Sequence, residues 1–95
     1  MRPYELMYIL QPTLTAEEQT ALVDRFNTLI TSSEGTVESC DRWEKRNMQY
    51  EIKNFREGYY VVVNFQGTPT LVAELDRQIK ITETIIRHMI LRKDD

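Results

Sequence analysis

The chain begins with a run of residues, 4–10, that reads YELMYIL and is largely apolar on both faces of an extended strand. Successive residues of a strand point to opposite faces of a sheet, so a run with two apolar faces is typical of an interior strand. Residues 11–13 end this strand, because Pro12 has no amide to donate to a strand ladder. The pattern therefore predicts an interior strand near the N-terminus.

A helix is predicted after this strand. Thr15 and Glu18 have the spacing of a capping box, in which each side chain accepts a hydrogen bond from a free amide at the helix start. Gly35 marks the expected end of the helix. The apolar residues in between recur at helical spacing, and we interpret this stripe as core: Leu22, Phe26, Leu29 and Ile30.

The next segment, residues 36–54, predicts a long polar strand. Its end, MQYEIK, alternates well, with the apolar residues at even positions. The earlier apolar residues, Val37 and Trp43, are odd-numbered, so the register has to shift, and a bulge or bend at residues 44–47 would shift it. Because one face of this strand is highly charged, we expect it at an edge of the sheet.

The second half of the chain predicts a turn, a strand, a helix and a last strand. The turn is expected at residues 54–58, and residues 59–65, YYVVVNF, form the strongest strand pattern in the chain. Thr68-Pro69 predicts a helix start, with threonine as the N-cap and proline at the first helical position. A strand from about residue 84 to 91 follows, and the tail RKDD is expected to be solvated.

The order strand, helix, strand, strand, helix, strand predicts an α+β fold of the ferredoxin-like, split β-α-β type (βαββαβ). Right-handed crossovers place the first and third strands at the centre of a four-stranded antiparallel sheet, with two helices on one face. The other face carries apolar and aromatic side chains without a helix, and such a face usually contacts a partner. The 95 residues are expected to form a single domain, 1–95.

The composition of the chain limits the classes of function that it can have. The net charge of −3 gives the whole molecule no attraction for nucleic acid, so such binding would need a local basic patch. Cys40 is the only cysteine and His88 the only histidine, which excludes an internal disulfide and a zinc cluster of these residues. The sequence has no apolar run of membrane-spanning length and no signal-peptide pattern, so we expect a cytoplasmic protein without membrane contact.

The sequence shows no catalytic apparatus. Nothing places Cys40 beside His88, and the three glycines are too far apart to form a phosphate-binding loop. The loop at residues 11–13 lacks the paired cysteines that a metal-carrying version of this fold needs. We therefore expect no enzyme, no cofactor, no metal and no small-molecule substrate.

Base stacking on the sheet is not expected either. The third strand of an RNA recognition motif reads basic, glycine, aromatic, small, aromatic. Residues 57–61 read EGYYV, with an acid in the basic position and valine in place of the second stacking ring.

Basic residues cluster near the two ends of the chain. Arg2 begins the first strand, while Arg87, His88, Arg92 and Lys93 lie on or after the last. In this topology the two strands are antiparallel neighbours, so Arg2 is expected near Arg92 and Lys93, in a corner suited to phosphate. The alternative is that these are ordinary solvated charges.

A second basic group surrounds the expected bulge. Arg42, Lys45 and Arg46 lie there together with Trp43 and Tyr50. Tryptophan, tyrosine and arginine dominate the hot spots of protein interfaces, so this group indicates a contact with a protein. The alternative is that Trp43 covers the edge of the core.

The chain resembles the bacterial small-subunit ribosomal protein six family over almost its whole length. The likeness rests on four segments in the correct order: MRPYELMYILQP at 1–12, WEKRNMQYEI at 43–52, FREGYY at 55–60 and IIRHMILR at 85–92. Two positions depart from the family's pattern, since Glu44 stands where glycine is usual and Gln49 where alanine is common. The first could alter the bulge, and the second adds a polar group to the strand.

The resemblance implies a structural component of the small ribosomal subunit that catalyses nothing and is monomeric until it assembles. It implies binding to the central domain of small-subunit rRNA as a heterodimer with ribosomal protein eighteen. The residues that it assigns to rRNA are Arg2, Arg87, Arg92 and Lys93, with Tyr4 and Lys80 as weaker candidates. Those that it assigns to protein eighteen are Arg42, Trp43, Arg46 and Tyr50.

Two other interpretations share this topology. A small ligand-binding regulatory domain that acts as a homodimer usually has a glycine between the first strand and the first helix, and residues 11–14 contain none. An acyl-phosphate hydrolase needs a phosphate-cradling loop with an arginine at the same place, and no arginine is there. Self-association would favour the regulatory domain.

Overall fold

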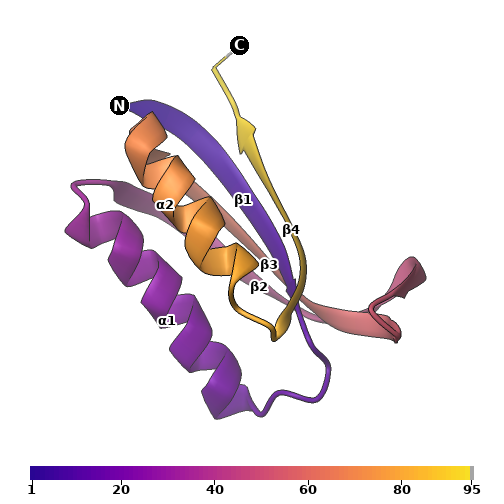
Figure 1. Ribbon diagram of the computed structural model, residues 1–95. Coiled ribbons are helices and arrows are strands. Elements are labelled where there is room, and N and C mark those ends of the chain that lie inside the picture. The colour runs from indigo at the N-terminus through magenta and orange to yellow at the C-terminus, as the bar shows by residue number, and fades with distance from the viewer. Residues whose placement is uncertain (95) are drawn as a thin grey trace.

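The computed structural model describes residues 1–94, whose elements follow the predicted order. The elements are β1 (Arg2–Leu10), α1 (Ala16–Ser32), β2 (Thr36–Ile52), β3 (Phe55–Gly67), α2 (Pro69–Lys80) and β4 (Ile85–Arg92). The sheet has the order β2-β3-β1-β4, and each neighbouring pair is antiparallel. Both helices lie on one face of the sheet (Figure 1). The predicted ferredoxin-like fold, with β1 and β3 in the centre, is thus confirmed.

The core lies between the two helices and the even-numbered residues of β1. Leu6, Tyr8 and Leu10 are fully buried there, and the Tyr8 ring meets Phe26 of α1 edge-on, with ring centroids 5.6 Å apart. Burial of a leucine side chain such as Leu6 or Leu10 stabilises the fold by about 1.5–3 kcal/mol. Burial also raises the pKa of the Tyr8 phenol, which keeps the group neutral in the core.

Both helices begin with the predicted caps. Thr15 Oγ1 accepts a hydrogen bond from the Glu18 amide at 3.2 Å, and the Glu18 carboxylate accepts one from the Thr15 amide at 2.9 Å. At α2, Thr68 Oγ1 accepts a hydrogen bond from the Leu71 amide at 3.2 Å, with Pro69 in the first turn. A cap of this kind is worth about 1 kcal/mol, so local sequence determines where each helix starts.

The end of α1 differs from the prediction. The left-handed residue after the helix is Glu34, with φ of 66°, and Gly35 keeps a negative φ. Gly35 is needed for space instead, because a Cβ there would lie 2.8 Å from the carbonyl oxygens of Ile30 and Gln66. The chain therefore uses the glycine to bring α1 close to β3, and a charged residue adopts the left-handed backbone.

The turn between β2 and β3 is shorter than predicted. It consists of Lys53 and Asn54, whose positive φ values of 52° and 71° suit a tight two-residue hairpin. The predicted turn at residues 54–58 is therefore wrong, and β3 begins at Phe55. The prediction placed Gly58 in the turn because glycine is common in turns. The residue lies inside β3 instead, where a Cβ would be 2.8 Å from the Leu10 carbonyl oxygen.

The register of β2 against β3 shifts at three places. One shift, between Arg42 and Lys45, overlaps the predicted bulge at residues 44–47. The largest lies beyond it: β2 takes five residue steps from Asn47 to Ile52, while β3 takes two steps between their partners. The surplus residues bend the end of the β2–β3 hairpin, called here the hairpin tip (residues 47–56), which extends past the other strands in Figure 1.

An ion-paired cluster joins α2 to β4. His88 Nε2 lies 2.6 Å from Asp76 Oδ1, and Lys80 Nζ lies 2.8 Å from the other carboxylate oxygen. The hydrogen bond with His88, and then that with Lys80, lower the pKa of Asp76 below its usual value. A carboxylate stabilised in this way contributes to folding only while it is ionised.

We expect Gly35→Ala to destabilise the fold by about 1–3 kcal/mol, because the added methyl group overlaps backbone oxygens that cannot move independently. Glu34→Gly is the matched control. It should stabilise the fold by about 0.5–1 kcal/mol, since it relieves a left-handed backbone. Urea denaturation measures both changes. The opposite pattern would mean that the left-handed residue is Gly35.

We expect the stability difference between wild type and Asp76→Asn to depend on pH. The contribution of Asp76 is present above the ordinary aspartate pKa of about 3.9 and is lost as the pH falls through the lowered value in the folded state. Wild type should therefore melt higher than Asp76→Asn at pH 6, and the gap should narrow below about pH 4. Thermal melts from pH 6 to pH 2 test this, with Asp24→Asn as control for the substitution. A constant gap would contradict it.

Candidate functional site

The helix-free face of the sheet, called here the open face, carries a strip of apolar side chains. In the register, Met7 of β1 lies between Val62 of β3 and Met89 of β4. Ile9 lies next to Tyr60 in the same way. None of these residues was singled out in the sequence, although their signal was present in the second apolar face of residues 4–10.

An aromatic cluster borders this strip on β2. The Trp43 ring stacks on Tyr60, with ring centroids 6.0 Å apart and an interplanar angle of 14°. The Arg46 guanidinium lies over the Trp43 ring, 4.5 Å from its centroid. Cation–π contacts at exposed sites are worth about 0.5–1 kcal/mol, so Arg46 and Trp43 hold each other in place on a surface that stays accessible. Trp43 is 39% exposed.

Arg42 is separated from this cluster. It pairs with Val61, a buried residue, and its Nη1 donates a hydrogen bond to Thr20 Oγ1 of α1 at 3.0 Å. Arg42 therefore points to the helix side, while Trp43 points to the open face. Neighbouring strand residues alternate in this manner, and a sequence cluster on a strand is accordingly divided between two faces.

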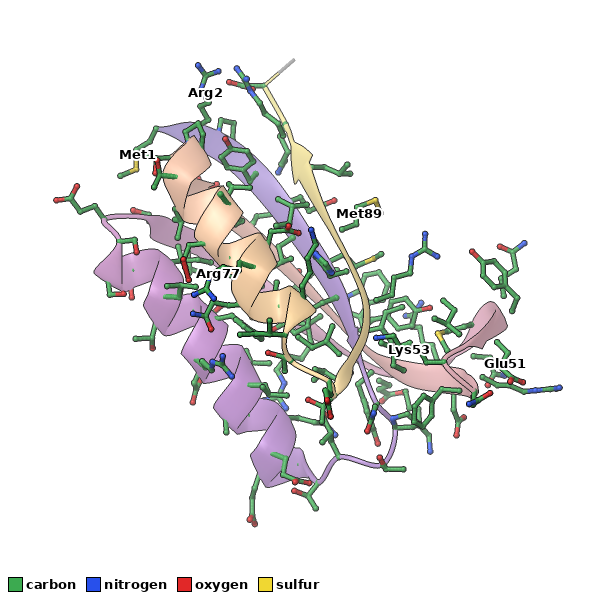
Figure 2. All side chains as sticks on the ribbon, in the orientation of Figure 1. Met1, Arg2, Glu51, Lys53, Arg77 and Met89 are labelled. Carbon is green, nitrogen blue, oxygen red and sulfur yellow. The ribbon has the colours of Figure 1, made fainter. Side chains whose placement is uncertain are left out.

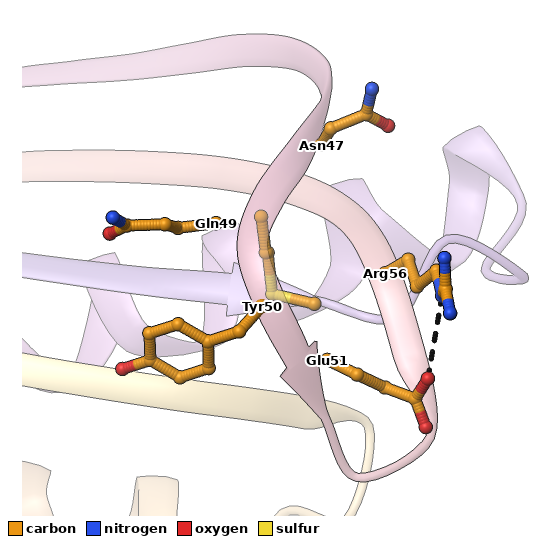
Figure 3. A pocket seen from close by; sticks show the side chains of 6 residues that line it. Asn47, Gln49, Tyr50, Glu51 and Arg56 are labelled. Atoms are coloured by element: carbon orange, nitrogen blue, oxygen red, sulfur yellow. Dashed lines mark hydrogen bonds and ion pairs between the residues drawn. The ribbon is translucent and has the colours of Figure 1, made fainter.

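The hairpin tip reaches over the open face to β4. Tyr50, which is 59% exposed, accepts a hydrogen bond from Arg87 Nη1 of β4 at 3.2 Å. Figure 3 shows the Tyr50 ring extending from the tip, and the Glu51–Arg56 ion pair of 3.4 Å on the other side. Beneath the tip is a recess of about 210 Å³, lined by Met7, Ile9, Met48, Gln49, Tyr50, Ile52, Tyr60 and Arg87.

The basic residues at the two chain ends lie together, as the strand order predicted. Arg92 of β4 lies opposite Tyr4 of β1 in the strand register, and the Lys93 amide donates a hydrogen bond to the Pro3 carbonyl oxygen at 2.9 Å. Figure 2 shows Arg2 at the same end of the sheet as the end of β4. Lys93 Nζ donates to Asn64 Oδ1 at 2.8 Å, while Arg92 forms an ion pair with Asp94, two residues further along the chain.

The other candidate contacts for RNA are distributed along the β4 edge. Arg87 is five residues from Arg92, which corresponds to roughly 17 Å along a strand, and the odd number of steps places the two side chains on opposite faces of the sheet. Lys80 is linked to the middle of β4 through the cluster of Asp76 and His88. Tyr4 is 7% exposed and stacks on Phe65 with ring centroids 5.5 Å apart, which makes it a core residue at the same end.

Cys40 and His88, the candidate nucleophile and base, lie far apart in the structure. Cys40 lies on β2 and His88 on β4, the two edge strands, which are about 14 Å apart at a strand spacing of 4.8 Å. Among residues 1–94, no three histidine, cysteine, aspartate or glutamate side chains are grouped to hold a metal ion. The helices of this same part of the chain are too short or too polar to span a membrane. The arrangement offers surfaces for binding.

Comparison with known proteins gives a consistent result over the full chain. The family model described as Ribosomal protein S6 matches residues 3–92. The small ribosomal subunit protein bS6 of Moorella thermoacetica is 45% identical over 95 residues, which cover all of this chain and 97% of the relative. That of Desulforudis audaxviator is 47% identical over 94 residues, covering 99% of this chain and all of the relative.

The solved structures agree with this match. The crystal structure of 30S ribosomal protein S6 from Thermotoga maritima superposes with a TM-score of 0.92 at 34% identity, covering 97% of this chain and 87% of that one. The C-terminal domain of the MgtC protein from Mycobacterium tuberculosis, with a TM-score of 0.66 and 10% identity, shares the fold alone. The homologues are structural ribosomal proteins of a family not known as enzymes. From the match of sequence and fold over nearly its entire length, the chain belongs to the ribosomal protein S6 family.

Proposed function

We propose that this protein is a structural component of the small ribosomal subunit in the cytoplasm and takes part in translation without catalysing a reaction. In this proposal it binds the central domain of small-subunit rRNA together with ribosomal protein eighteen. The observation that carries the proposal is family membership over the whole chain, with relatives that are named as small-subunit proteins. Two surfaces, one basic and one apolar, support the two contacts.

The rRNA contact is proposed along the β4 edge. Arg2, Arg92 and Lys93 would contact phosphates at one end and Arg87 at the other, with Lys80 and Tyr4 as weaker contributors. Phosphate contacts position a protein on RNA. Arg87 lies toward the open face and Arg92 toward the helix side, so the edge strand β4 offers cations on both of its faces. Because Arg92 is paired with Asp94 in the free chain, its contact with a phosphate has to replace an internal ion pair.

The contact with protein eighteen is proposed on the open face and β2. Trp43, Arg46 and Tyr50 would supply the anchoring side chains around the apolar strip, and Arg42 lies at the margin. Large aromatic and arginine side chains with part of their surface accessible are typical of binding hot spots. The protein is proposed to be monomeric until it assembles. A basic partner would raise the RNA affinity of a chain whose own net charge is −3.

Sucrose-gradient sedimentation of a lysate at low and moderate salt tests the proposed function. The protein should migrate with small subunits at both salt concentrations. If it stays in the soluble fraction even at low salt, the ribosomal proposal is wrong. Size-exclusion chromatography of the soluble protein would then distinguish a homodimer, which the regulatory-domain alternative requires, from a monomer.

We expect Arg92→Ala to reduce the salt dependence of rRNA binding by the complex with protein eighteen. One lost phosphate contact changes the slope of log affinity against log salt by about 0.7–0.9. Filter binding of a central-domain rRNA fragment at several salt concentrations measures the slope. Arg77→Ala is the matched control, because Arg77 lies on α2 in an ion pair with Glu74. If both variants keep the wild-type slope, Arg92 does not contact a phosphate.

A further inference from the structure

The two proposed contact surfaces meet at one hydrogen bond. Tyr50 belongs to the surface proposed for the protein partner, and Arg87 to the edge proposed for RNA. Arg87 Nη1 donates to the Tyr50 hydroxyl at 3.2 Å, although the residues are 37 positions apart in sequence. They come from the opposite edge strands β2 and β4, with β3 and β1 between them. Contact between two edge strands requires one of them to cross the face of the sheet.

The hairpin tip makes this crossing possible. Its surplus residues between Asn47 and Ile52 bend β2 away from its regular pairing, and Tyr50 is one of them. Ile9 lies under the tip and is 3% exposed, although no helix covers that face of the sheet. The tip therefore acts as the cover for one end of the open face. It leaves the recess of about 210 Å³ beneath it.

The tip is held weakly in this position. The Tyr50–Arg87 hydrogen bond lies between exposed side chains, where water competes for both partners. The Glu51–Arg56 ion pair joins residues within the tip and does not attach it to the sheet. The recess also limits how much apolar packing holds the tip down. A ligand that takes either partner of the hydrogen bond can thus release the tip.

The hydrogen bond to Tyr50 also affects how Arg87 can bind a phosphate. A bidentate contact with a phosphate uses two parallel N–H groups of one guanidinium. In the free chain the bond to Tyr50 directs this guanidinium toward the hairpin tip. A phosphate that draws the Arg87 guanidinium to the β4 edge and a partner that takes up the Tyr50 hydroxyl would each break this bond, which uses one of the five N–H groups of the guanidinium.

Building on the proposed function, we propose that the Tyr50–Arg87 hydrogen bond couples the RNA edge to the partner surface. Whichever ligand binds first breaks the bond, and the second then binds without that cost. The coupling is positive and reciprocal, because it is a difference in free energy shared by the two sites. An exposed hydrogen bond corresponds to a coupling of about two- to fivefold in affinity.

The test is a set of dissociation constants for a central-domain rRNA fragment, measured with and without saturating protein eighteen. Wild type, Tyr50→Phe and Tyr59→Phe are compared. Tyr59→Phe is the matched control, because it removes the same hydroxyl from a half-buried tyrosine of β3. We expect Tyr50→Phe to bind RNA about two- to fivefold more tightly without the partner and equally well with it, so the enhancement by the partner shrinks by that factor. Tyr59→Phe should behave as wild type.

Several outcomes would overturn the coupling. If Tyr50→Phe binds RNA equally or more weakly without the partner, Tyr50 does not compete for Arg87. If wild type fails to bind RNA even with the partner, the proposed function fails and the coupling fails with it, which the wild-type measurement alone reveals. An NMR relaxation measurement on the free chain needs no RNA. Amides 48–51 should become more mobile in Tyr50→Phe than in wild type or Tyr59→Phe, and unchanged mobility would overturn the proposal.

Discussion

The structure depends on one constraint, which is that two helices cover a four-stranded sheet on one face only. β1 lies between two strands and directs its even-numbered residues into the core, where Leu6, Tyr8 and Leu10 are fully buried. These side chains form one core with the buried residues of α1, α2, β3 and β4, and burial of that core is the main favourable term in folding. The same strand necessarily presents its odd-numbered residues on the opposite face. The open face is therefore a direct result of how the core is made.

The two ends of the open face differ in how far they are covered. At one end the bent hairpin tip covers Ile9 and leaves a small recess. Toward the other end Met89 remains accessible, beside the strip formed with Met7. An apolar face of this kind is a liability in isolation and an advantage in an assembly, because its burial against a partner provides affinity. The stacked Trp43 and Tyr60 add directional contacts at its border.

The strand order, and not the net charge, decides where basic side chains lie together on the surface. Four of the twelve lysine and arginine residues lie at the chain ends and along the edge strand β4, and three of these four are already engaged with neighbouring polar groups. Arg87 is bonded to Tyr50, Arg92 to Asp94 and Lys93 to Asn64. Free cations of this kind would attract any polyanion, whereas engaged ones favour a ligand that offers better geometry. Binding is then selective for the surface on which several contacts are made together.

The sequence by itself determined the element order, the interior strands, the helix starts and the family. These features rest on local patterns, such as the Thr15–Glu18 capping box, and on alternation within single strands. Only the tertiary structure decided that Gly35 and Gly58 serve close packing and that Arg42 and Trp43 point to opposite sides of the sheet. It alone brought Tyr50 to Arg87. The physical reason is that such placements depend on register shifts and on approaches between distant strands, which no local pattern encodes.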